Sequence, residues 1–393
     1  MISVDEAQAR TLALCTPLGS QMVPLRAAHG RVMAEDAVTS LTQPPFAASA
    51  MDGYAIREAD HHGGNTLQVV GEASAGHGFG GQIGPGQCAR IFTGAPVPKG
   101  AERVILQEDV TRQDSTITLG ERLEQSRHIR PAGQDFKAGD RLTAPRRLRP
   151  ADVALLASMN IAELPVAKRP EVAIMATGDE LVSPGDIPGP DQIIASNSYG
   201  IAALAEAAGA KVRMLPITRD NEASLRFAFA LAASADIIVT SGGASVGDHD
   251  LVGKVAQDMG MERAFWKISM RPGKPLMVGR LGASVLLGLP GNPVSSIVCA
   301  HLFLVPMLDR LQGLSGRHDI RKARLATSVD ATGPRTHYMR ARLSHDADMM
   351  QITPFDRQDS ALLSILSQAD ALLIRPLGDG PRAAGTIVDY LPI

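Results

Sequence analysis

Three short segments of the sequence combine glycine or proline with polar side chains, as ligand-binding loops do. They are residues 176–181 (ATGDEL), 241–250 (SGGASVGDHD) and 288–296 (GLPGNPVSS). Glycine lets backbone N–H groups approach a ligand oxygen closely, and hydroxyl groups add further donors. A tight structural turn is the other explanation for each loop taken alone. If the three loops lie at one edge of a sheet, they favour a site for an anionic ligand.

Carboxylates occur in the same loops, at Glu180, Asp248 and Asp250. Carboxylate oxygens are hard ligands, and Mg²⁺ is commonly held by one or two of them together with substrate phosphates. The loops therefore suit Mg²⁺ bridging to phosphate groups better than they suit a softer metal.

Cations gather in one further segment. The chain has 31 Arg but only 8 Lys, and residues 265–275 (FWKISMRPGKP) contain Lys267, Arg271 and Lys274. Pro272 excludes a helix, so the alternation predicts a strand with Lys267 and Arg271 on one face, ~13 Å apart. That spacing suits two separated anionic groups, with Lys274 in the following turn. An edge strand with its charges in solvent is the other explanation.

The pattern after residue 169 predicts the scaffold that would bring these groups together. Apolar runs and helical periodicity alternate along it. Strands are predicted at 172–176, 211–215, 237–240 and 285–289, and helices at 198–208 and 222–233. Such alternation predicts a parallel sheet covered by helices. Ligands bind beyond the carboxyl ends of parallel strands, so we expect the three loops to meet at one edge.

The remaining sequence predicts further domains, because 393 residues exceed the size of a single core. Short β-type runs separated by Gly and Pro predict a β-rich domain. The predicted fold class is α/β multidomain, with a helical first domain, an inserted β-rich domain, a parallel helix-covered core and a C-terminal β domain. The predicted bounds are 1–45 with 131–169, then 46–130, 170–314 and 315–393.

Composition excludes several classes of function. The net charge of −2 predicts neither nucleic acid nor an anionic membrane as a partner. Cys15, Cys88 and Cys299 are too far apart for a metal pair or a disulfide framework, which fits a reducing compartment. The first residues are acidic where an export signal would be basic, and the apolar run 297–308 is shorter than the ~20 residues that span a bilayer. We therefore expect a cytoplasmic protein.

Two more motifs, residues 49–55 (SAMDGYA) and 93–98 (TGAPVP), precede the three loops. In this order the motifs resemble the molybdopterin molybdenumtransferase family, which includes MoeA and the gephyrin E domain. The resemblance covers the whole chain and implies an elongated homodimer of four-domain subunits with a molybdopterin-binding core. It also implies a transferase that inserts molybdate into adenylylated molybdopterin, aided by Mg²⁺, with release of AMP. Other proteins of molybdenum cofactor biosynthesis are then candidate partners.

The resemblance also assigns residues, position by position. The implied catalytic residues are Asp52, Thr93, Asp135, Glu180, Asp220, Asp250, Lys267 and Arg271. Of these, the first three are expected to act across the dimer on the partner's sheet, and Glu180 and Asp250 to hold the metal. The residues expected to bind substrate are Gly242, Gly243, Ser245, Lys274, Pro290, Asn292, Pro293, Ser295, Arg340 and Ser360.

The sequence departs from the family pattern at two places. Ala47 and Ala48 stand where many members have Asp-Asn, and Arg271 stands where many have Lys. Arginine keeps the positive charge and adds a bidentate fork, so anion binding should survive. A non-catalytic molybdopterin-binding scaffold and a molybdopterin adenylyltransferase are the alternative functions. Acidic and cationic groups at one loop edge argue against the scaffold, and the four-domain layout favours the molybdenumtransferase.

Overall fold

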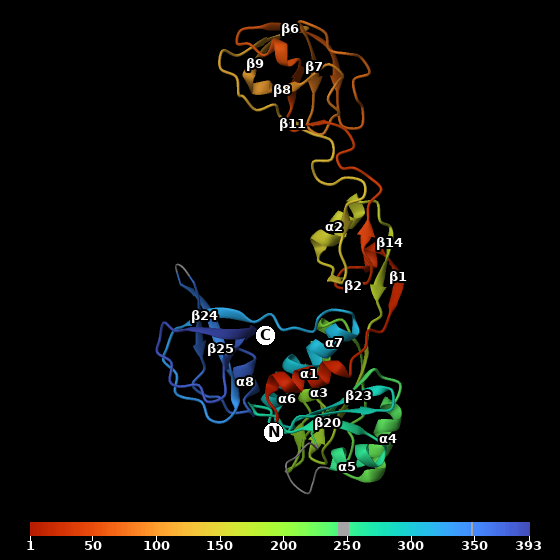
Figure 1. The fold of residues 1–393 in the computed structure, drawn as a ribbon, viewed down its shortest axis with the longest axis vertical. Helices are drawn as coiled ribbons and strands as arrows, with labels where there is room; N and C mark the ends of the chain where they lie inside the picture. The colour runs from red at the N-terminus through yellow and green to blue at the C-terminus, as the bar shows by residue number, and fades with distance from the viewer. Residues whose placement is uncertain (243–250, 347–348) are drawn as a thin grey trace.

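The computed structural model describes residues 1–242, 251–346 and 349–393. Figure 1 shows an elongated molecule with a β-rich insert at one end and an α/β core at the other. A small sheet and a neck lie between them, and a C-terminal β domain lies beside the core. The multidomain α/β fold class is therefore confirmed.

The α/β core contains a six-stranded sheet in the order β18-β15-β19-β23-β22-β20. The strands are β15 (Glu171–Ala176), β18 (Lys211–Met214), β19 (Ile237–Ser241), β20 (Glu262–Trp266), β22 (Met277–Leu281) and β23 (Ser284–Leu289). As predicted, β18, β15, β19 and β23 are parallel. The sheet is nevertheless mixed, because β22 is antiparallel to both β23 and β20. A tight turn with Gly282 at φ 59° joins β22 to β23, as in a hairpin.

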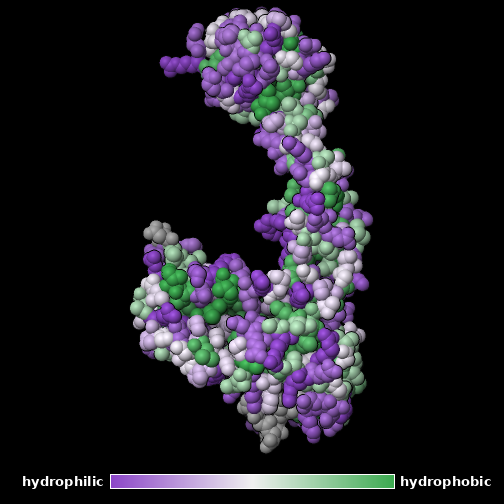
Figure 2. Space-filling view, viewed as in Figure 1, coloured by the Kyte–Doolittle hydropathy of each residue, from purple (hydrophilic) through white to green (hydrophobic). Residues whose placement is uncertain are grey.

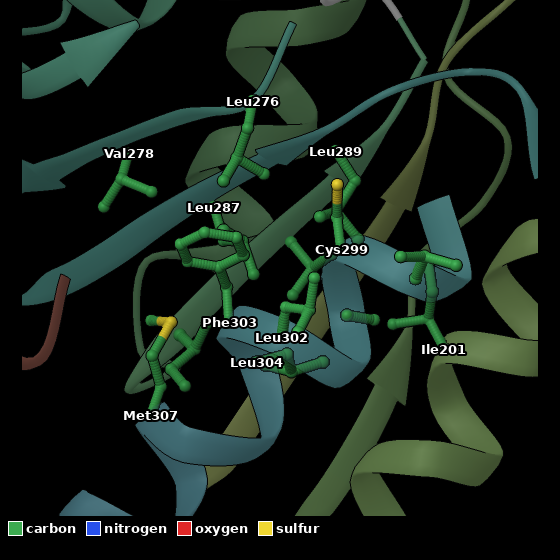
Figure 3. Packing of buried hydrophobic residues seen from close by; sticks show 14 of the residues in the cluster. Ile201, Leu276, Val278, Leu287, Leu289, Cys299, Leu302, Phe303, Leu304 and Met307 are labelled. Atoms are coloured by element: carbon green, nitrogen blue, oxygen red, sulfur yellow. The ribbon is translucent and has the colours of Figure 1, made fainter. Parts of the chain in front are cut away.

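Helices cover both faces of this sheet. Alternate residues of β15 point to opposite faces, so Val172 and Ile174 are buried in one cluster, Ala173 and Met175 in another. The first face carries α1 (Val4–Ala13), α3 (Asn197–Ala207), α6 (Pro293–Cys299) and α7 (Val305–Leu311); the second carries α4 (Glu222–Ala232) and α5 (Leu251–Asp258). Figure 3 shows the first cluster, where the helical segment around Phe303 packs on Leu287 and its neighbours.

The segment Pro293–Leu311 is one continuous helix with a π-helical turn, η4 (Ala300–Leu304), between α6 and α7. It is long and apolar enough to cross a membrane by length and composition, but 72% of it is buried inside the structure. Packing against the sheet therefore accounts for its apolar character.

The region expected to be a helical first domain contains fewer helical residues than predicted. Its helices are α1 and α2 (Pro150–Ser158), and α1 packs on the α/β core. Between α1 and Pro44 the chain forms strands instead. The small sheet has the order β1-β14-β2-β13, with β1 (Ser20–Pro24), β2 (Val32–Met33), β13 (Arg146–Arg147) and β14 (Glu163–Ala167). Pairing of β1 with the distant β14 decides this structure, and local periodicity does not reveal such pairing.

One arginine joins the small sheet to the core. Arg147 of β13 donates to the Asp309 carboxylate (2.9 Å) of α7 and to the Ala208 carbonyl (3.1 Å) after α3. It also donates to the Gly30 carbonyl (3.0 Å) within its own part of the chain. The ion pair therefore helps to fix the direction in which the small sheet leaves the core.

The insert is a six-stranded sheet in the order β8-β5-β7-β6-β10-β9. Its strands are β5 (Gly53–Ile56), β6 (Thr66–Ala73), β7 (Gln87–Ile91), β8 (Arg103–Leu106), β9 (Val110–Gln113) and β10 (Thr116–Leu119). Two apolar clusters fill it, one containing Tyr54 and Ile117 and the other Ala55 and Val104.

The neck is made of two antiparallel pairs: β3 (Ala37–Val38) with β12 (Arg141–Leu142), and β4 (Ala48–Ser49) with β11 (Ile129–Arg130).

The C-terminal domain is a closed sheet, because β27 pairs with both β28 and β25. Its strands are β24 (Arg321–Leu325), β25 (Thr336–Asp346), β26 (Met349–Pro354), β27 (Ala371–Arg375) and β28 (Ile387–Pro392), and α8 (Leu363–Leu366) lies between β26 and β27. A short strand from the core segment, β21 (Met270–Arg271), adds to β25 in parallel. The core and the C-terminal domain therefore share a sheet edge.

Candidate active site

One row of paired residues crosses the core sheet near the edge at which β15, β19, β20 and β23 end and β22 begins. Met175 pairs with Thr240, Thr240 with Gly288, Gly288 with Met277, and Met277 with Trp266. Because β20 is antiparallel to β22, and β22 to β23, the carboxyl end of β20 points to the same edge as those of β15, β19 and β23. The loops after these four strands therefore converge, as predicted for three of them.

A pocket of about 660 Å³ lies at this edge, and we call it the strand-end pocket. Predicted site residues that line it are Glu180, Asp220, Gly242, Pro290, Asn292, Pro293 and Ser295. Thr177, from the predicted loop 176–181, lines it as well, and so does Asn197, which the sequence did not single out. The structure thus brings parts of all three loops around one cavity.

Glycine is required at Gly242, where φ is +99° and an added Cβ would lie 2.5 Å from the Thr177 carbonyl oxygen. The loop after β19 therefore contacts the loop after β15 directly. Gly291, in the loop after β23, would bring a Cβ to 3.7 Å from the Gly242 Cα, which is ordinary contact. These close backbone approaches hold the pocket floor together without large side chains.

Asn197 ties two of these loops together from the first turn of α3. Its Nδ2 donates to the Gly291 carbonyl (2.7 Å) and the Ser241 hydroxyl (3.1 Å). Its Oδ1 is buried and has no hydrogen-bond partner among the residues that the structure describes. A buried acceptor without a donor is costly, so this oxygen suits a donor from a ligand. No local sequence signal separates this asparagine from one that only begins a helix.

The carboxylates form a cluster at the pocket rim. Glu180 lies beside Gly178, where an added Cβ would meet its carboxylate at 2.4 Å. Loss of solvent around Asp220 raises the pKa of its carboxyl, and the charges of Asp179 and Glu180 raise it further. Within the described parts of the chain, none of these three carboxylates has an ion-pair partner. The cluster is therefore an uncompensated negative charge that suits a hard cation.

A complete metal site is not formed by the residues that the structure describes, because no group of three or more His, Cys, Asp or Glu side chains is suitably arranged. The predicted positions Gly243, Ser245 and Asp250 lie outside the described residues. The predicted ligand pair of Glu180 and Asp250 therefore stays a prediction.

The predicted continuous strand through Lys267 and Arg271 is wrong. β20 ends at Trp266, and Lys267 has a φ of +68°, a conformation that breaks a strand. Backbone bonds from Lys267 N to the Leu276 carbonyl and from Ile268 N to the Lys274 carbonyl, both 3.0 Å, close a loop instead. Lys267 thus lies in a loop just after β20, whereas Arg271 belongs to β21 in another sheet, and the ~13 Å spacing expected for one straight strand does not apply.

Arg271 lines a second cleft, of about 320 Å³, whose other lining residues all belong to the C-terminal domain. It pairs with His337 of β25, which pairs in turn with Arg375 of β27, so the three residues form a row. Burial lowers the pKa of His337 to about 4, with further lowering from Arg271 and other arginines. Arg271 is not among the residues that line the strand-end pocket. Lys274 precedes Pro275, which does line it.

The C-terminal domain reaches the strand-end pocket through the loop that carries Ser360. The Asn292 amide donates to the Ser360 hydroxyl (3.1 Å), and Val294 N donates to the Ser360 carbonyl (2.9 Å). Arg340 is only 2% exposed and donates to the Asp359 carbonyl (2.9 Å) and to Gln358. Arg340 therefore supports this loop, whereas the sequence suggested a direct contact with an oxyanion.

The insert carries a separate polar pair. One carboxylate oxygen of Asp52 accepts hydrogen bonds from the backbone N–H and the hydroxyl of Thr93, both 2.7 Å. These bonds lower the pKa of Asp52, and the charge of Arg90 adds to the effect. The third predicted member, Asp135, is exposed in the neck. Figure 1 shows the insert at the opposite end of the molecule from the α/β core. The chain does not bring Asp52 to its own strand-end pocket.

Comparison with known proteins covers nearly the whole chain. Three family models match in succession: "MoeA N-terminal region (domain I and II)" at 2–160, "Probable molybdopterin binding domain" at 173–310 and "MoeA C-terminal region (domain IV)" at 322–393. A molybdopterin molybdenumtransferase of Haemophilus influenzae is 39% identical over 80% of this chain and 78% of its own length. Its counterpart in Nostoc sp. is 35% identical over 95% and 89%. A molybdopterin biosynthesis MoeA protein from Pyrococcus horikoshii OT3 superposes with a TM-score of 0.85, at 26% identity and full coverage of both chains.

Proposed function

Because the chain belongs to the MoeA family of molybdopterin molybdenumtransferases, we propose that it inserts molybdate into adenylylated molybdopterin and releases AMP. The observation that carries this proposal is the convergence of carboxylates, amides and hydroxyls around the strand-end pocket, with Lys267 emerging at the same sheet edge. An activity that joins two anions needs this combination of metal-binding and cationic groups.

Charge is the main obstacle to the reaction. Molybdate is a dianion and the adenylylated pterin carries a diphosphate, so bringing them together requires neutralisation in a confined space. Neither Lys267 nor Lys274 lines the pocket, but Lys267 follows β20 at the same sheet edge and Lys274 precedes Pro275, which does line it, so both are proposed to supply positive charge there. Asn292 and Ser295 supply neutral donors that orient the pterin side. The pterin dithiolate and molybdate provide the reacting atoms, so no nucleophilic side chain is required.

We propose that Mg²⁺ is held by Glu180 and Asp250, with Asp220 nearby. The uncompensated carboxylates at the rim fit this ion, and Mg²⁺ commonly uses one or two protein carboxylates and completes its shell with phosphate and water. When bound, it would neutralise phosphate charge. Glu180→Gln keeps the shape of the side chain but removes its charge, so half-saturation of AMP release should need about tenfold more Mg²⁺. Equal half-saturation in wild type and variant would place the metal elsewhere.

We further propose that the enzyme is a homodimer in which Asp52, Thr93 and Asp135 complete the partner's pocket. The distance of the insert from its own core supports this arrangement. Apolar side chains are exposed near Asp52, with Met51 at 43% and Phe46 at 42%. Figure 2 also shows apolar surface on the insert where it meets the neck. A cytoplasmic location, small-molecule substrates and no nucleic-acid or membrane partner complete the proposal.

The deciding experiment is incubation of the purified chain with adenylylated molybdopterin, molybdate and Mg²⁺, followed by measurement of AMP. Molybdate-dependent release of AMP is expected, and activity should be lost in EDTA. Binding of molybdopterin without AMP release would favour a scaffold. Formation of adenylylated molybdopterin from ATP and molybdopterin would favour an adenylyltransferase.

A further inference from the structure

The chain has a single tryptophan, and it lies against a lysine proposed to bind substrate. The Lys267 ammonium is 3.7 Å from the centroid of the Trp266 ring, which is close for a cation–π contact. A second cation, Arg263, is farther from the same ring, at 5.5 Å. The indole therefore contacts one cation just after the end of β20 and another near its beginning.

This contact depends on the break in the strand. Successive side chains of a strand point to opposite faces, so an extended Lys267 would point away from the Trp266 ring. The φ of +68° at Lys267 ends β20 and allows the two side chains to meet. Such a conformation is disfavoured for a residue with a Cβ, and it persists only where the surroundings hold it. Here the backbone bond from Lys267 N to the Leu276 carbonyl (3.0 Å) holds it.

The ring itself is held by packing. Trp266 is paired with Met277 of β22 and packs against the apolar cluster of the second sheet face. Its Nε1 is buried, and no hydrogen-bond partner for it is found in the described part of the chain. The position of the ring is therefore set by the sheet.

Lys267 has no carboxylate partner among the residues that the structure describes. An aromatic face attracts an ammonium group without neutralising it, whereas a carboxylate would compete with an incoming anion. A lysine held on a ring thus keeps its full charge and loses part of its conformational freedom before the ligand binds. This is the property expected of a preorganised anion contact.

We propose that Trp266 is a positioning residue that holds the Lys267 ammonium at the edge of the strand-end pocket for the oxyanion substrate. The proposal rests on the proposed role of Lys267 in the molybdate transfer. In this proposal Trp266 does not contact either substrate. It acts only through its contact with Lys267.

The contact can be tested without substrates, because Trp266 is the only tryptophan and gives one indole N–H signal. Lys267→Met keeps the length of the side chain and removes the charge. It should shift the tryptophan emission and the indole ¹H–¹⁵N cross-peak of the free protein. Lys254→Met, which changes a lysine of α5, is the matched control and should leave both signals in place. Identical spectra for wild type and Lys267→Met would overturn the proposal.

Function is tested by a double-mutant cycle on the KM for molybdate. Trp266→Leu should raise this KM between about threefold and thirtyfold, the range for loss of one cation–π contact, and Trp266→Phe, which keeps a ring face, should raise it less. In a Lys267→Met background, Trp266→Leu should have no further effect. An equal effect in both backgrounds, or an unchanged KM in a folded Trp266→Leu protein, would overturn the proposal.

A further variant distinguishes the positioning of Lys267 by Trp266 from a general disturbance of β20. Arg263→Gln removes the other cation over the same ring, so it should alter the tryptophan emission but leave the KM for molybdate unchanged. A KM raised as much as by Trp266→Leu would contradict a specific role for the Lys267 contact. If the wild-type chain released no AMP, the proposed function would fail, and the substrate-free spectra would still decide whether the contact exists.

Discussion

The strand-end pocket and the Asp52–Thr93 pair are built in opposite ways. The pocket is made of loops whose backbones touch, at Gly242 and Thr177, above a sheet buried on both faces. The pair lies at the surface of the six-stranded insert, where the Asp52 carboxylate accepts two hydrogen bonds of 2.7 Å from the backbone N–H and the hydroxyl of Thr93. The core thus provides a shaped cavity, whereas the insert presents a carboxylate at its surface, which in the proposed dimer would complete a site on the partner.

The same contrast predicts different responses to mutation. Changes in the core should alter both folding and binding, because the same residues support the sheet and line the pocket. Changes at Asp52 or Thr93 should alter activity alone. The predictions below test this separation.

The largest effect is expected from mixing two inactive variants. Asp52→Ala removes the insert's carboxylate and Glu180→Ala removes one from the pocket, so each homodimer should be inactive. Mixed dimers should regain activity, because one of their two sites keeps both residues. The measurement is AMP release after the variants are unfolded and refolded together. Confirmed heterodimers without activity would contradict a shared site, and Asp52→Ala should melt at the wild-type temperature.

The next effect concerns Asn197, which links the loops after β19 and β23. Asn197→Ala removes two hydrogen bonds and the unpaired Oδ1, so the affinity for molybdopterin should fall about tenfold to a hundredfold. The melting temperature should fall as well, unlike that of Asp52→Ala. Binding is measured by calorimetry and stability by thermal unfolding. Unchanged affinity in the folded variant would exclude Asn197 from the site.

Lowering the pH should destabilise the α/β core through one buried histidine that takes no part in the proposed reaction. Burial lowers the pKa of His301 in η4 to about 4, and the charge of His318 adds to the effect. The unfolded chain, with a pKa near ~6.5, binds this proton first, so stability is lost as the pH falls from about 6.5 toward 4. Between pH 7 and pH 5 the loss from this group is about 2 kcal/mol.

His301→Leu should therefore reduce the fall in melting temperature between pH 7 and pH 5 by about 4 to 8 °C relative to wild type. Differential scanning calorimetry at both pH values measures it. Comparing the fall within each protein removes any constant effect of the substitution. An identical fall in both proteins would show that His301 is not responsible.

The smallest effect is expected at the insert. Thr93→Val removes the hydroxyl donor to Asp52 but keeps the backbone N–H, so the lowered pKa of Asp52 should rise part of the way back. If ionised Asp52 is required, activity falls as the pH falls through this pKa. The acidic limb of the pH–rate profile should then move to higher pH, with little change at neutral pH. A limb that stays in place would indicate that another group controls it.

Much of the core site could be predicted because strand ends in a parallel sheet meet at one edge. Glu180, Asn292 and Ser295 follow from that rule together with local loop composition. Asn197 was missed, because nothing local distinguishes an asparagine that bridges two distant loops from one that starts a helix. The sequence shows the charge of Arg340 but not that its side chain is buried, with 2% exposed, so its predicted contact with substrate stays a prediction.

Two other features lie beyond local patterns. The alternation around Lys267 is regular, yet the segment divides between two sheets because β21 pairs with β25, whose residues lie far ahead in the chain. The β-rich character of the insert was predicted, but its distance from the core depends on the neck. Tertiary pairing decided both outcomes.

The neck has a consequence for how the molecule can change. The chain enters the insert through β4 and leaves it through β11, which lie side by side as an antiparallel pair. Replacing the whole insert with that of a relative would therefore change the chain at two junctions that lie next to each other, and both junctions are far from the strand-end pocket. Adding one residue to each strand of such a ribbon lengthens it by ~3.4 Å. The number of residues in the neck thus sets the distance between Asp52 and the core, and this number can change without changing the residues at either site.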